Sequence, residues 1–429
     1  MHAAPGRWAV GLAAGVALLV VAACSDDDAA PATSTATTTT ATPSAPVTTE
    51  GDTTVGPAAT STTAPTSSTV TSTAVTTTTT ATTTAGASYD FSAIGPIVQN
   101  FVDQRGLNGA GLVVVDRDDG VVHEQYWGAF GPDRISLIAS SSKMITAGVL
   151  LRLQDEGLLD IDAPVAAVAP WGAANPTITS AQLLSNSSGL VGLLPNPGYG
   201  PYVCQYLPAG TLQDCAESIF TTAGDDADII APDTQFRYGG AQWQVAGAVA
   251  ELASGKSWAQ LIDEIYIKPC GLTTLGYNNH FTQLGAVTFD YPKAFTGDPA
   301  TLQPTDNPNM EGGVFVAPGD YAKLLLMHLR GGRCDGGQVL SQAALDRMHA
   351  DRIGPAYGGS AGPNTGYGMG WWVDRGTGRI NDPGAYGSVP WLDLQDGYGA
   401  YLVVESDAAT GVELAGQLYA AVEAAVKAG

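Results

Sequence analysis

Residues 140–143 form a Ser-x-x-Lys pattern, and this pattern is suited to nucleophilic chemistry. If a helix begins here, Ser140 and Lys143 lie on one face, because positions i and i+3 are neighbours on a helix surface. The positive end of the helix and partial burial both disfavour an ammonium, so Lys143 could accept the proton of Ser140. The pattern therefore predicts acyl transfer to Ser140. The alternative is a run of helix-capping serines followed by a solvated lysine.

A second serine pattern competes with this one. Residues 358–362 fit Gly-x-Ser-x-Gly with Ser360 at the centre, which is the nucleophile turn of another hydrolase fold. That turn needs a buried strand before the serine and a helix after it. Here a Gly-Pro pair precedes the pattern and a Pro-Asn pair follows it, which is the composition of a loop. We therefore expect Ser360 to be unreactive.

The elements around Ser140 predict an α/β fold with an antiparallel sheet flanked by helices. Two apolar, β-branched runs at residues 111–116 and 121–127 enclose a polar turn, which is typical of a β-hairpin. Helical spacing follows Ser140 and ends at Gly157. The order of the elements suits an antiparallel sheet better than a βαβ repeat. The remaining expected elements are a mainly helical insertion over about 160–345, strands near 368–373, 390–394 and 400–405, and a helix over 410–427.

The segment 138–147 resembles the nucleophile segment of class C β-lactamases and of their esterase and DD-peptidase relatives. Other segments match patterns of the same family in the same order along the chain. The resemblance covers about 90–425 and implies a β-lactamase/DD-peptidase-like fold. The further matching segments are Leu-Leu-Ser-Asn-Ser-Ser-Gly-Leu at 183–190, Met-Glu-Gly-Gly at 310–313 with Asp-Tyr at 320–321, and Tyr-Gly-Met-Gly-Trp-Trp at 367–372.

The resemblance also implies a proton-carrying tyrosine. The family's Tyr-x-Asn motif matches residues 238–240, where Tyr238 would shuttle a proton to the leaving group and help to activate water. Gly240 stands where the family has an asparagine that binds the substrate, so peptide-like recognition is in doubt. Asn186 likewise stands where a histidine is common. A similar Tyr-Gly-Gly at 357–359 has no helical pattern after it, and the alternative for Tyr238 is a plain core aromatic residue.

The family's third motif, Lys-Thr-Gly or His-x-Gly, best matches residues 382–384. Gly384 would let the backbone approach the substrate. The N–H groups of Ala385 and Ser140 would form the oxyanion hole. Asp382 stands where the family has a cation or an imidazole, and it would repel a substrate carboxylate if its side chain faces the cleft. The alternative is that Pro383 turns the strand so that Asp382 points to solvent.

The N-terminal part of the chain predicts export and a lipid anchor. Arg7 precedes an apolar run over 8–23, which is short for a transmembrane helix and suits a signal peptide. The run ends in Val-Ala-Ala before Cys24, which resembles a bacterial lipobox; the alternative is an ordinary signal peptide with a chance cysteine. Residues 24–87 are rich in Thr, Ser, Ala and Pro, and so predict a disordered tether. The folded hydrolase domain is then 88–429, outside the cytoplasm at the bacterial membrane.

Composition excludes several classes of partner and predicts cross-links. The chain has 18 basic and 41 acidic residues and a net charge of −23, which argues against nucleic-acid binding. Its five histidines are scattered and there is no CxxC or HExxH, so we expect neither a metal nor a cofactor. Four cysteines lie in the exported domain and permit three pairings. We favour Cys204–Cys215, which closes a short loop, and therefore Cys270–Cys334.

Two functions follow from these observations. The first is a serine hydrolase that forms an acyl-enzyme with a small ester, amide or cell-wall-related substrate. The second is a cell-surface binding or sensor domain that keeps the penicillin-binding-protein fold and has lost efficient turnover. Ser140, Lys143 and Tyr238 favour the enzyme. The binding domain is favoured by the departures from the family at Asn186, Gly240 and Asp382.

Overall fold

The computed structural model describes residues 88–192, 199–222, 228–280, 298–354, 357–359 and 362–429. The predicted signal peptide (1–23), the tether (24–87) with Cys24, and Ser360 lie outside the described residues. No helix within the described ranges is long and apolar enough to cross a membrane.

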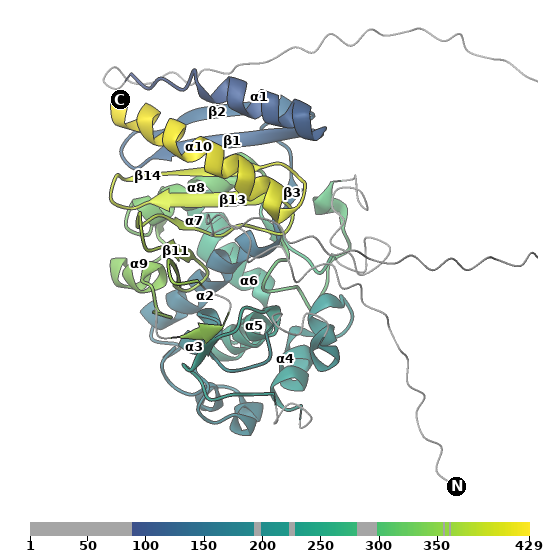
Figure 1. Cartoon of the computed structure of the whole chain (residues 1–429). Coiled ribbons are helices and arrows are strands. Elements are labelled where there is room, and N and C mark those ends of the chain that lie inside the picture. Colours follow the sequence, from purple (N-terminus) through teal and green to yellow (C-terminus); the bar gives the residue numbers. More distant parts are fainter. Residues whose placement is uncertain (1–87, 193–198, 223–227, 281–297, 355–356, 360–361) are drawn as a thin grey trace, which may run out of the picture. The chain divides into compact units, whose positions relative to one another are not determined.

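An antiparallel sheet of seven strands forms the framework, in the order β10-β11-β12-β13-β14-β1-β2 (Figure 1). Strands from both ends of the domain pair with each other, β1 with β14, where Leu112 lies opposite Leu402. The expected hairpin is present, and the Asp116 carboxylate closes its turn by accepting hydrogen bonds from two backbone N–H groups. The strands are β1 (Gly109–Asp116), β2 (Gly120–Gly128), β10 (Thr365–Tyr367), β11 (Trp372–Asp374), β12 (Ile380–Asn381), β13 (Ser388–Asp393) and β14 (Tyr398–Val403).

Alternating side chains of the sheet enter two cores, as the period of two along a strand requires. Leu112 and Val114 face α1 (Ile94–Arg105) and α10 (Ala408–Ala428), which cover one side of the sheet (Figure 1). Val113 belongs to the larger core on the other side, where α8 (Pro318–Leu329) packs on β1 and β14. The sheet therefore separates a small helical layer from the larger helical part of the domain.

Two helices of the larger core are buried on nearly all sides. These are α2 (Lys143–Asp155), which follows Ser140, and α5 (Gly240–Ser254), which follows Tyr238. They pack on each other, and a helix that is apolar all round belongs in a core. The residues just before them are thereby placed next to each other inside the domain.

Shorter elements complete the part of the domain that the structure describes. Three minor sheets have the orders β3-β6-β5, β4-β9 and β7-β8. The helices are α3 (Ser180–Leu184), α4 (Leu212–Phe220), α6 (Trp258–Ile262), α7 (Lys268–Cys270) and α9 (Gln342–His349), with a π-helical turn at Asp263–Ile267 and 3-10 turns at Ala139–Ser142, Val165–Ala167, Pro170–Ala174, Gly200–Tyr206 and Pro299–Thr301. The strands are β3 (Ser136–Leu137), β4 (Gln235–Phe236), β5 (Gly276–Tyr277), β6 (Val314–Val316), β7 (Arg333–Cys334), β8 (Gly337–Gln338) and β9 (Gly358–Gly359).

The strand expected over 368–373 is wrong in detail. The chain forms β10 and β11 with a turn between them, and Gly370 lies in this turn with φ at 83°. A Cβ on Gly370 would lie only 2.7 Å from the backbone nitrogen of Met144. The turn therefore packs tightly against the beginning of α2, and this contact interrupts the strand.

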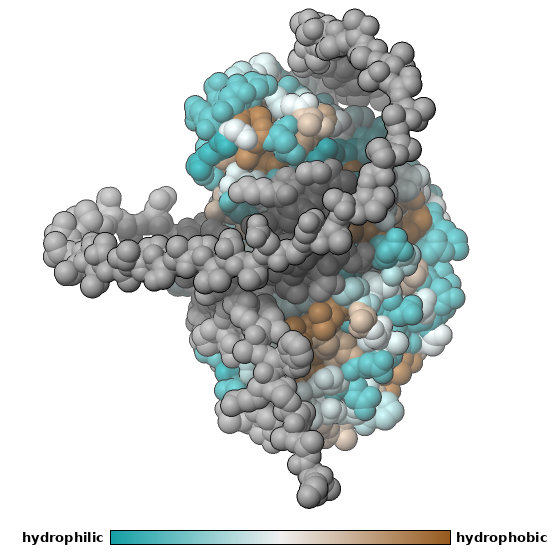
Figure 2. Space-filling model, turned by 90° about the vertical axis from the view of Figure 1, so that its right-hand side faces the viewer, coloured by the Kyte–Doolittle hydropathy of each residue, from teal (hydrophilic) through white to brown (hydrophobic). Residues whose placement is uncertain are grey.

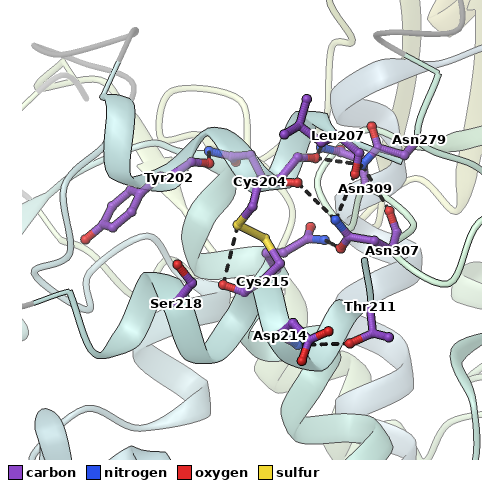
Figure 3. The surroundings of a disulfide bond; sticks show 12 residues. Tyr202, Cys204, Leu207, Thr211, Asp214, Cys215, Ser218, Asn279, Asn307 and Asn309 are labelled. Carbon is purple, nitrogen blue, oxygen red and sulfur yellow. Dashed lines mark hydrogen bonds between the residues drawn. A yellow bond between two sulfur atoms is a disulfide. The ribbon is translucent and has the colours of Figure 1, made fainter. Parts of the chain in front are cut away.

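Both disulfides have the expected pairing. Cys204–Cys215 joins the 3-10 turn Gly200–Tyr206 to α4 (Figure 3), and Cys270–Cys334 joins the end of α7 to β7. The amide of Asn307 donates to the carbonyl oxygens of Cys204 and Leu207 at 3.0 and 2.8 Å. A covalent bond and buried amides thus fix this segment.

The described surface in Figure 2 mixes hydrophilic residues with separate apolar patches. The large apolar side chains that are exposed among the described residues come from different parts of the fold and include Leu158, Val203, Leu252 and Leu394.

Candidate active site

Ser140 is the one serine of its run that is left free for chemistry. Ser141 Oγ donates to the Asp382 carbonyl at 2.6 Å, and Ser142 Oγ donates to the Ala139 carbonyl at 2.6 Å. Both of these side chains are fully buried, whereas Ser140 is half-buried. Ala139 has a φ of 46°, which an alanine rarely adopts, so the backbone turns sharply at the nucleophile.

Lys143 lies directly beside Ser140. Its Nζ is 2.9 Å from Ser140 Oγ, and its side chain has no solvent exposure. The Ser142 side chain caps no backbone N–H of the helix. The alternative of a capping serine run with a solvated lysine is therefore excluded.

Tyr238 is brought to the same point by the buried start of α5. Lys143 Nζ lies 4.7 Å from the centre of the Tyr238 ring, and the phenol hydrogen-bonds with Lys143 and Ser140. The ring stacks on Trp372 with a centroid distance of 5.3 Å. Burial raises the pKa of the Tyr238 phenol, and Lys143 partly opposes this effect. Serine, lysine and tyrosine thus meet although 98 residues of chain, from 140 to 238, separate the first from the last.

The charge of Lys143 differs from the sequence-based expectation. Burial alone would lower the pKa of its amine, but Tyr238, Glu311 and Asp382 together raise it above its ordinary value. The expected neutral lysine is therefore wrong for the resting site. The physical reason is a carboxylate that the sequence analysis did not assign to the site: Glu311 Oε2 lies 3.3 Å from Lys143 Nζ.

Glu311 occupies the space that a side chain at position 240 would need. A Cβ on Gly240 would lie 2.1 Å from Glu311 Oε1 and 2.2 Å from Gln205 Oε1. The expected loss of an amide at Gly240 is thus accompanied by a carboxylate from elsewhere in the chain. The only sequence signal was the position of Glu311 immediately before the two glycines of the 310–313 match.

Asn186 has a structural contact with the start of α5. It is fully buried, and its Oδ1 accepts hydrogen bonds from the Gly239 N–H at 3.3 Å, Gln242 Nε2 at 3.1 Å and Trp243 Nε1 at 3.3 Å. Asn186 therefore helps to fix the backbone on which Tyr238 is carried.

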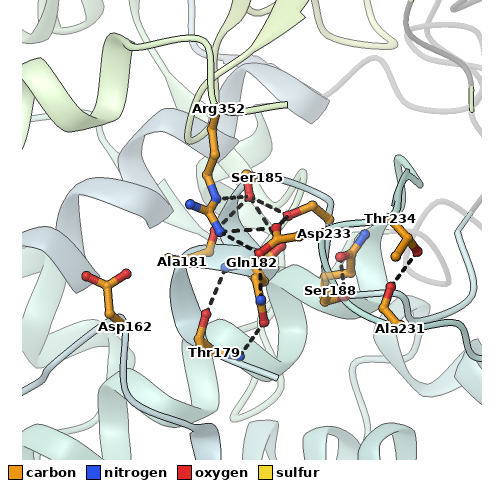
Figure 4. A network of polar contacts seen from close by, with 12 residues as sticks. Asp162, Thr179, Ala181, Gln182, Ser185, Ser188, Ala231, Asp233, Thr234 and Arg352 are labelled. Atoms are coloured by element: carbon orange, nitrogen blue, oxygen red, sulfur yellow. Dashed lines mark hydrogen bonds and ion pairs between the residues drawn. The ribbon is translucent and has the colours of Figure 1, made fainter. Parts of the chain in front are cut away.

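A polar network lies next to Asn186 in the chain and involves Ser185 and Ser187 (Figure 4). The Arg352 guanidinium donates to Ser185 Oγ at 2.9 Å and pairs with Asp233 at 3.2 Å. Asp233 also accepts from Gln182 and Ser187, so it links α3 to the segment before β4. The competing Tyr357 belongs to this network, because its hydroxyl hydrogen-bonds with Asp233.

The third-motif segment lies against the nucleophile turn. A Cβ on Gly384 would lie 1.9 Å from the Ile138 carbonyl oxygen, so only glycine fits this approach. Ala385, which is half-buried, follows Gly384 immediately. The Asp382 carbonyl accepts from Ser141. The segment is thus placed beside the residues that precede Ser140.

The Asp382 carboxyl is buried rather than exposed. It has no solvent exposure, and neither oxygen has a hydrogen-bond partner among the described residues. Burial raises the pKa of this carboxyl well above its ordinary value, and Lys143 only partly offsets the effect. The expected like charge in the cleft is therefore weakened, because the protonated form is favoured.

Comparison with known proteins gives a family match over residues 95–424 to the model described as Beta-lactamase. The chain is 28% identical over 316 residues to penicillin-binding protein 4 of Amycolatopsis lactamdurans, covering 68% of this chain and 78% of that protein. It is 25% identical to the lovastatin esterase of Penicillium rubens, covering 52% of this chain and 61% of the esterase.

Solved structures give the same fold. A candidate beta-lactamase from Bacteroides dorei DSM 17855 aligns with a TM-score of 0.62 and 26% identity, over 78% of this chain and all of that one. The family match spans well over half of the chain. The chain belongs to the beta-lactamase family, whose members are serine hydrolases such as penicillin-binding proteins and esterases.

Proposed function

We propose that this protein is a serine hydrolase that forms an acyl-enzyme at Ser140. The observation that carries this proposal is the 2.9 Å contact between Ser140 Oγ and the buried Lys143 Nζ, beneath the ring of Tyr238. The Ser140 hydroxyl loses its proton to Lys143 and attacks a carbonyl carbon. The N–H groups of Ser140 and Ala385 stabilise the oxyanion.

Tyr238 completes the two halves of the reaction. Its phenol passes a proton to the leaving alcohol or amine as the acyl bond breaks. It then takes a proton from a water molecule, which attacks the acyl carbon and releases the acid. Lys143 returns its proton to Ser140 Oγ as the acyl–oxygen bond breaks, so the enzyme is restored and one ester or amide has been hydrolysed.

The proposed substrate is a small neutral ester or amide, which includes esters and amides derived from the cell wall. Two carboxyl groups, those of Glu311 and Asp382, act on the single amine of Lys143. Such a site disfavours an anionic substrate, because Glu311 already balances the charge of Lys143 and Asp382 supplies no cation in its place. Similar proteins include both a penicillin-binding protein and an esterase, so ester and amide chemistry both fall within the family.

A serine-directed fluorophosphonate probe, with mass-spectrometric mapping of the labelled residue, tests the nucleophile. We expect label on Ser140 in the wild type and none in Ser140→Ala. Ser360→Ala is the matched control and should label normally. Label that survives Ser140→Ala but disappears in Ser360→Ala would overturn the assignment.

Substrate preference is tested by kcat/KM for a neutral p-nitrophenyl ester and for a chromogenic cephalosporin. The wild type should prefer the ester, and Asp382→Lys should move the preference toward the cephalosporin. Efficient hydrolysis of the cephalosporin by the wild type would contradict the proposed substrate class.

A weakly catalytic binding domain is the second candidate, and the raised pKa of Lys143 favours it, since an ammonium cannot accept the Ser140 proton. The two candidates differ in turnover. A binding domain would release no more than one product per molecule and would accumulate acyl-enzyme, whereas a hydrolase would continue after this burst.

We also propose that the protein is exported and anchored to the bacterial membrane through Cys24. The support is the apolar run that ends in Val-Ala-Ala-Cys and is followed by an acidic stretch. Cys24→Ala in the native host should abolish lipid labelling and move the protein to the soluble fraction. A variant that stays in the membrane would point to an uncleaved N-terminal segment.

A further inference from the structure

Glu311 contacts Lys143 through both its side chain and its backbone. Lys143 Nζ donates to the Glu311 carbonyl oxygen at 3.2 Å and lies 3.3 Å from Oε2. The other carboxylate oxygen accepts from the Tyr206 hydroxyl at 3.3 Å. Glu311 is 7% exposed, so its carboxylate is buried together with the amine that it pairs with. A buried ion pair contributes little net stability, because the cost of desolvating both charges offsets their attraction. The pair between Glu311 and Lys143 therefore matters mainly for the protonation of the amine.

Gly240 makes room for this carboxylate. Because a Cβ at this position would overlap Glu311 Oε1 and Cδ at 2.1 and 2.2 Å, any residue with a side chain would displace the carboxylate. The two positions are 71 residues apart in the chain, from 240 to 311, and are matched in space. Gly240 therefore does more than remove the amide of the family's asparagine. It also leaves the space that the Glu311 carboxylate needs.

The neighbours of the carboxylate are held rigidly. Asn279 and Asn309 donate to the Gln205 carbonyl oxygen at 3.0 and 2.8 Å, and the adjacent Cys204 is bonded to Cys215 (Figure 3). This segment carries Tyr206, which touches the carboxylate. The position of Glu311 is therefore built in before any substrate binds.

We propose that Glu311, housed by Gly240, is a positioning residue that serves as the counter-ion of Lys143 and sets the pH at which the Ser140–Lys143 pair becomes reactive. This inference rests on the proposed role of Lys143 as the acceptor of the Ser140 proton. In the resting site the amine is an ammonium paired with Glu311, and it must release one proton before it can accept another. Glu311 thereby shifts the reactive form toward alkaline pH.

The direction of the effect follows from the groups around Lys143. Burial disfavours the ammonium, whereas Tyr238 and Glu311 favour it. Asp382 favours it only in its ionised form, which its own burial opposes. Tyr206 and Tyr367 also face Glu311, but they stay neutral because burial raises the pKa of both phenols. Burial lowers the pKa of Lys143, and the charge of Glu311 counteracts this effect. Without that charge, the pKa of Lys143 should fall by roughly 1–3 pH units.

The first test is Glu311→Gln, which keeps the volume of the side chain and removes its charge. The acid limb of kcat/KM for a neutral p-nitrophenyl ester should move to lower pH by about one pH unit or more. Asp320→Asn is the matched control, because Asp320 is also buried beside a lysine, Lys323, but contacts Thr273 and Thr274 instead of the site. Its acid limb should stay in place. An unchanged limb in an active Glu311→Gln would overturn the inference.

The second test does not depend on activity. The chain has six lysines, so the Nζ signal of Lys143 can be assigned in ¹⁵N-lysine NMR spectra by comparison with Lys143→Arg. The titration midpoint of this signal should be lower in Glu311→Gln than in the wild type. If the midpoint falls while neither protein hydrolyses esters, the counter-ion role stands and the hydrolase proposal fails. If the midpoint does not move, the inference fails whatever the activity.

Gly240→Ala provides a variant that leaves Glu311 in the chain. The atoms nearest to the new methyl group belong to the side chains of Glu311 and Gln205 rather than to the backbone, so the protein should still fold. We expect the Lys143 midpoint to fall, and to fall no further when Gly240→Ala is added to Glu311→Gln. Additive shifts in this double-mutant cycle, or no shift in Gly240→Ala, would show that the two positions are not coupled.

Discussion

Several contacts of the site converge on Lys143. Its single Nζ is shared by the nucleophile Ser140, the carboxylate and carbonyl of Glu311, and the ring of Tyr238. Each contact orients the amine, and their charges decide when it holds a proton. The reactivity of the site is thus a property of this small group rather than of the Ser-x-x-Lys pattern alone.

Removing either proton carrier should reduce turnover while the protein remains folded. Lys143→Ala and Tyr238→Phe are each expected to lower kcat by about 10²–10⁴-fold, the usual contribution of a general acid or base. Tyr238→Phe keeps the ring that stacks on Trp372, so its circular dichroism spectrum and melting temperature should stay close to those of the wild type. A kcat near the wild-type value would remove that residue from the mechanism.

Asp382 should make stability fall as pH rises. Because burial raises its pKa in the folded protein, the stabilising proton is fully bound below the unfolded pKa near 3.8 and is lost as pH rises toward the folded value. The cost is about 1.4 kcal/mol per pH unit within this window. Asp382→Asn removes this cost. In urea unfolding, the free energy of unfolding of the variant should therefore rise relative to that of the wild type between about pH 4 and pH 7.

Asp320→Asn is the control for this measurement. The pKa of Asp320 is lowered in the folded state through its hydrogen bonds with Lys323 and Thr274, although burial opposes them, so its window lies below 3.8. The stability difference between Asp320→Asn and the wild type should therefore be flat from about pH 4 to pH 7. A flat difference for Asp382→Asn as well would show that its carboxyl is ionised at no cost.

At the scale of elements, the beginnings of α2 and α5 form the site. Ser140 and Lys143 belong to the first, and Tyr238 lies just before the second. The two helices pack on each other inside the larger core, so neither start can move independently. The first turn of α5 depends on Asn186, whose Oδ1 accepts from Gly239, Gln242 and Trp243.

Asn186→Ala should therefore loosen the start of α5 and misplace Tyr238. Leaving buried donors without an acceptor costs about 1–3 kcal/mol. We expect kcat to fall roughly 10–100-fold, since a displacement of about 1 Å has effects of this size. The control is Thr211→Ala, which removes the cap of α4, where Thr211 Oγ1 accepts from Asp214. It should cost about 1 kcal/mol of stability with kcat unchanged. Equal losses of kcat in both variants would reduce Asn186 to a general stabilising residue.

At the scale of the whole molecule, the sheet closes with strands from both ends of the domain, and the site residues come from the chain between them. The two disulfides differ in what they hold. Cys204–Cys215 closes a separation of 11 residues next to the carboxylate of Glu311, whereas Cys270–Cys334 closes a separation of 64 residues in α7 and β7.

Removing the two disulfides separately should have different effects. In the chain-entropy model the longer loop contributes about 4 kcal/mol and the shorter one about 3 kcal/mol. Cys270→Ser with Cys334→Ser should thus lower stability more and leave the pH profile of kcat/KM unchanged. Cys204→Ser with Cys215→Ser should alter that profile, because Gln205 and Tyr206 are then held less firmly. An identical pH profile in both variants would show that the shorter disulfide has no effect on the site.

Local features of the sequence were sufficient for several conclusions. The Ser-x-x-Lys spacing, the hairpin over 109–128 and the helix 408–428 depend on neighbours within a few turns or strands, so their patterns are readable from the sequence. The antiparallel fold and the pairing of the four cysteines were predicted and are present in the structure. The signal peptide and the lipid anchor at Cys24 remain predictions from the sequence.

Only the tertiary structure revealed what surrounds Lys143. Glu311 lies 168 residues away from Lys143 in the chain, and no local pattern marks it as the partner of a buried amine. From the sequence alone, Lys143 was expected to be neutral and Gly240 to leave the place of the family's asparagine side chain unfilled. Asn186 was interpreted as a departure that favours a binding domain over an enzyme. In the folded protein the lysine is paired, the place is filled and Asn186 holds a helix start, because the charge and the space at a site depend on residues that only packing brings together.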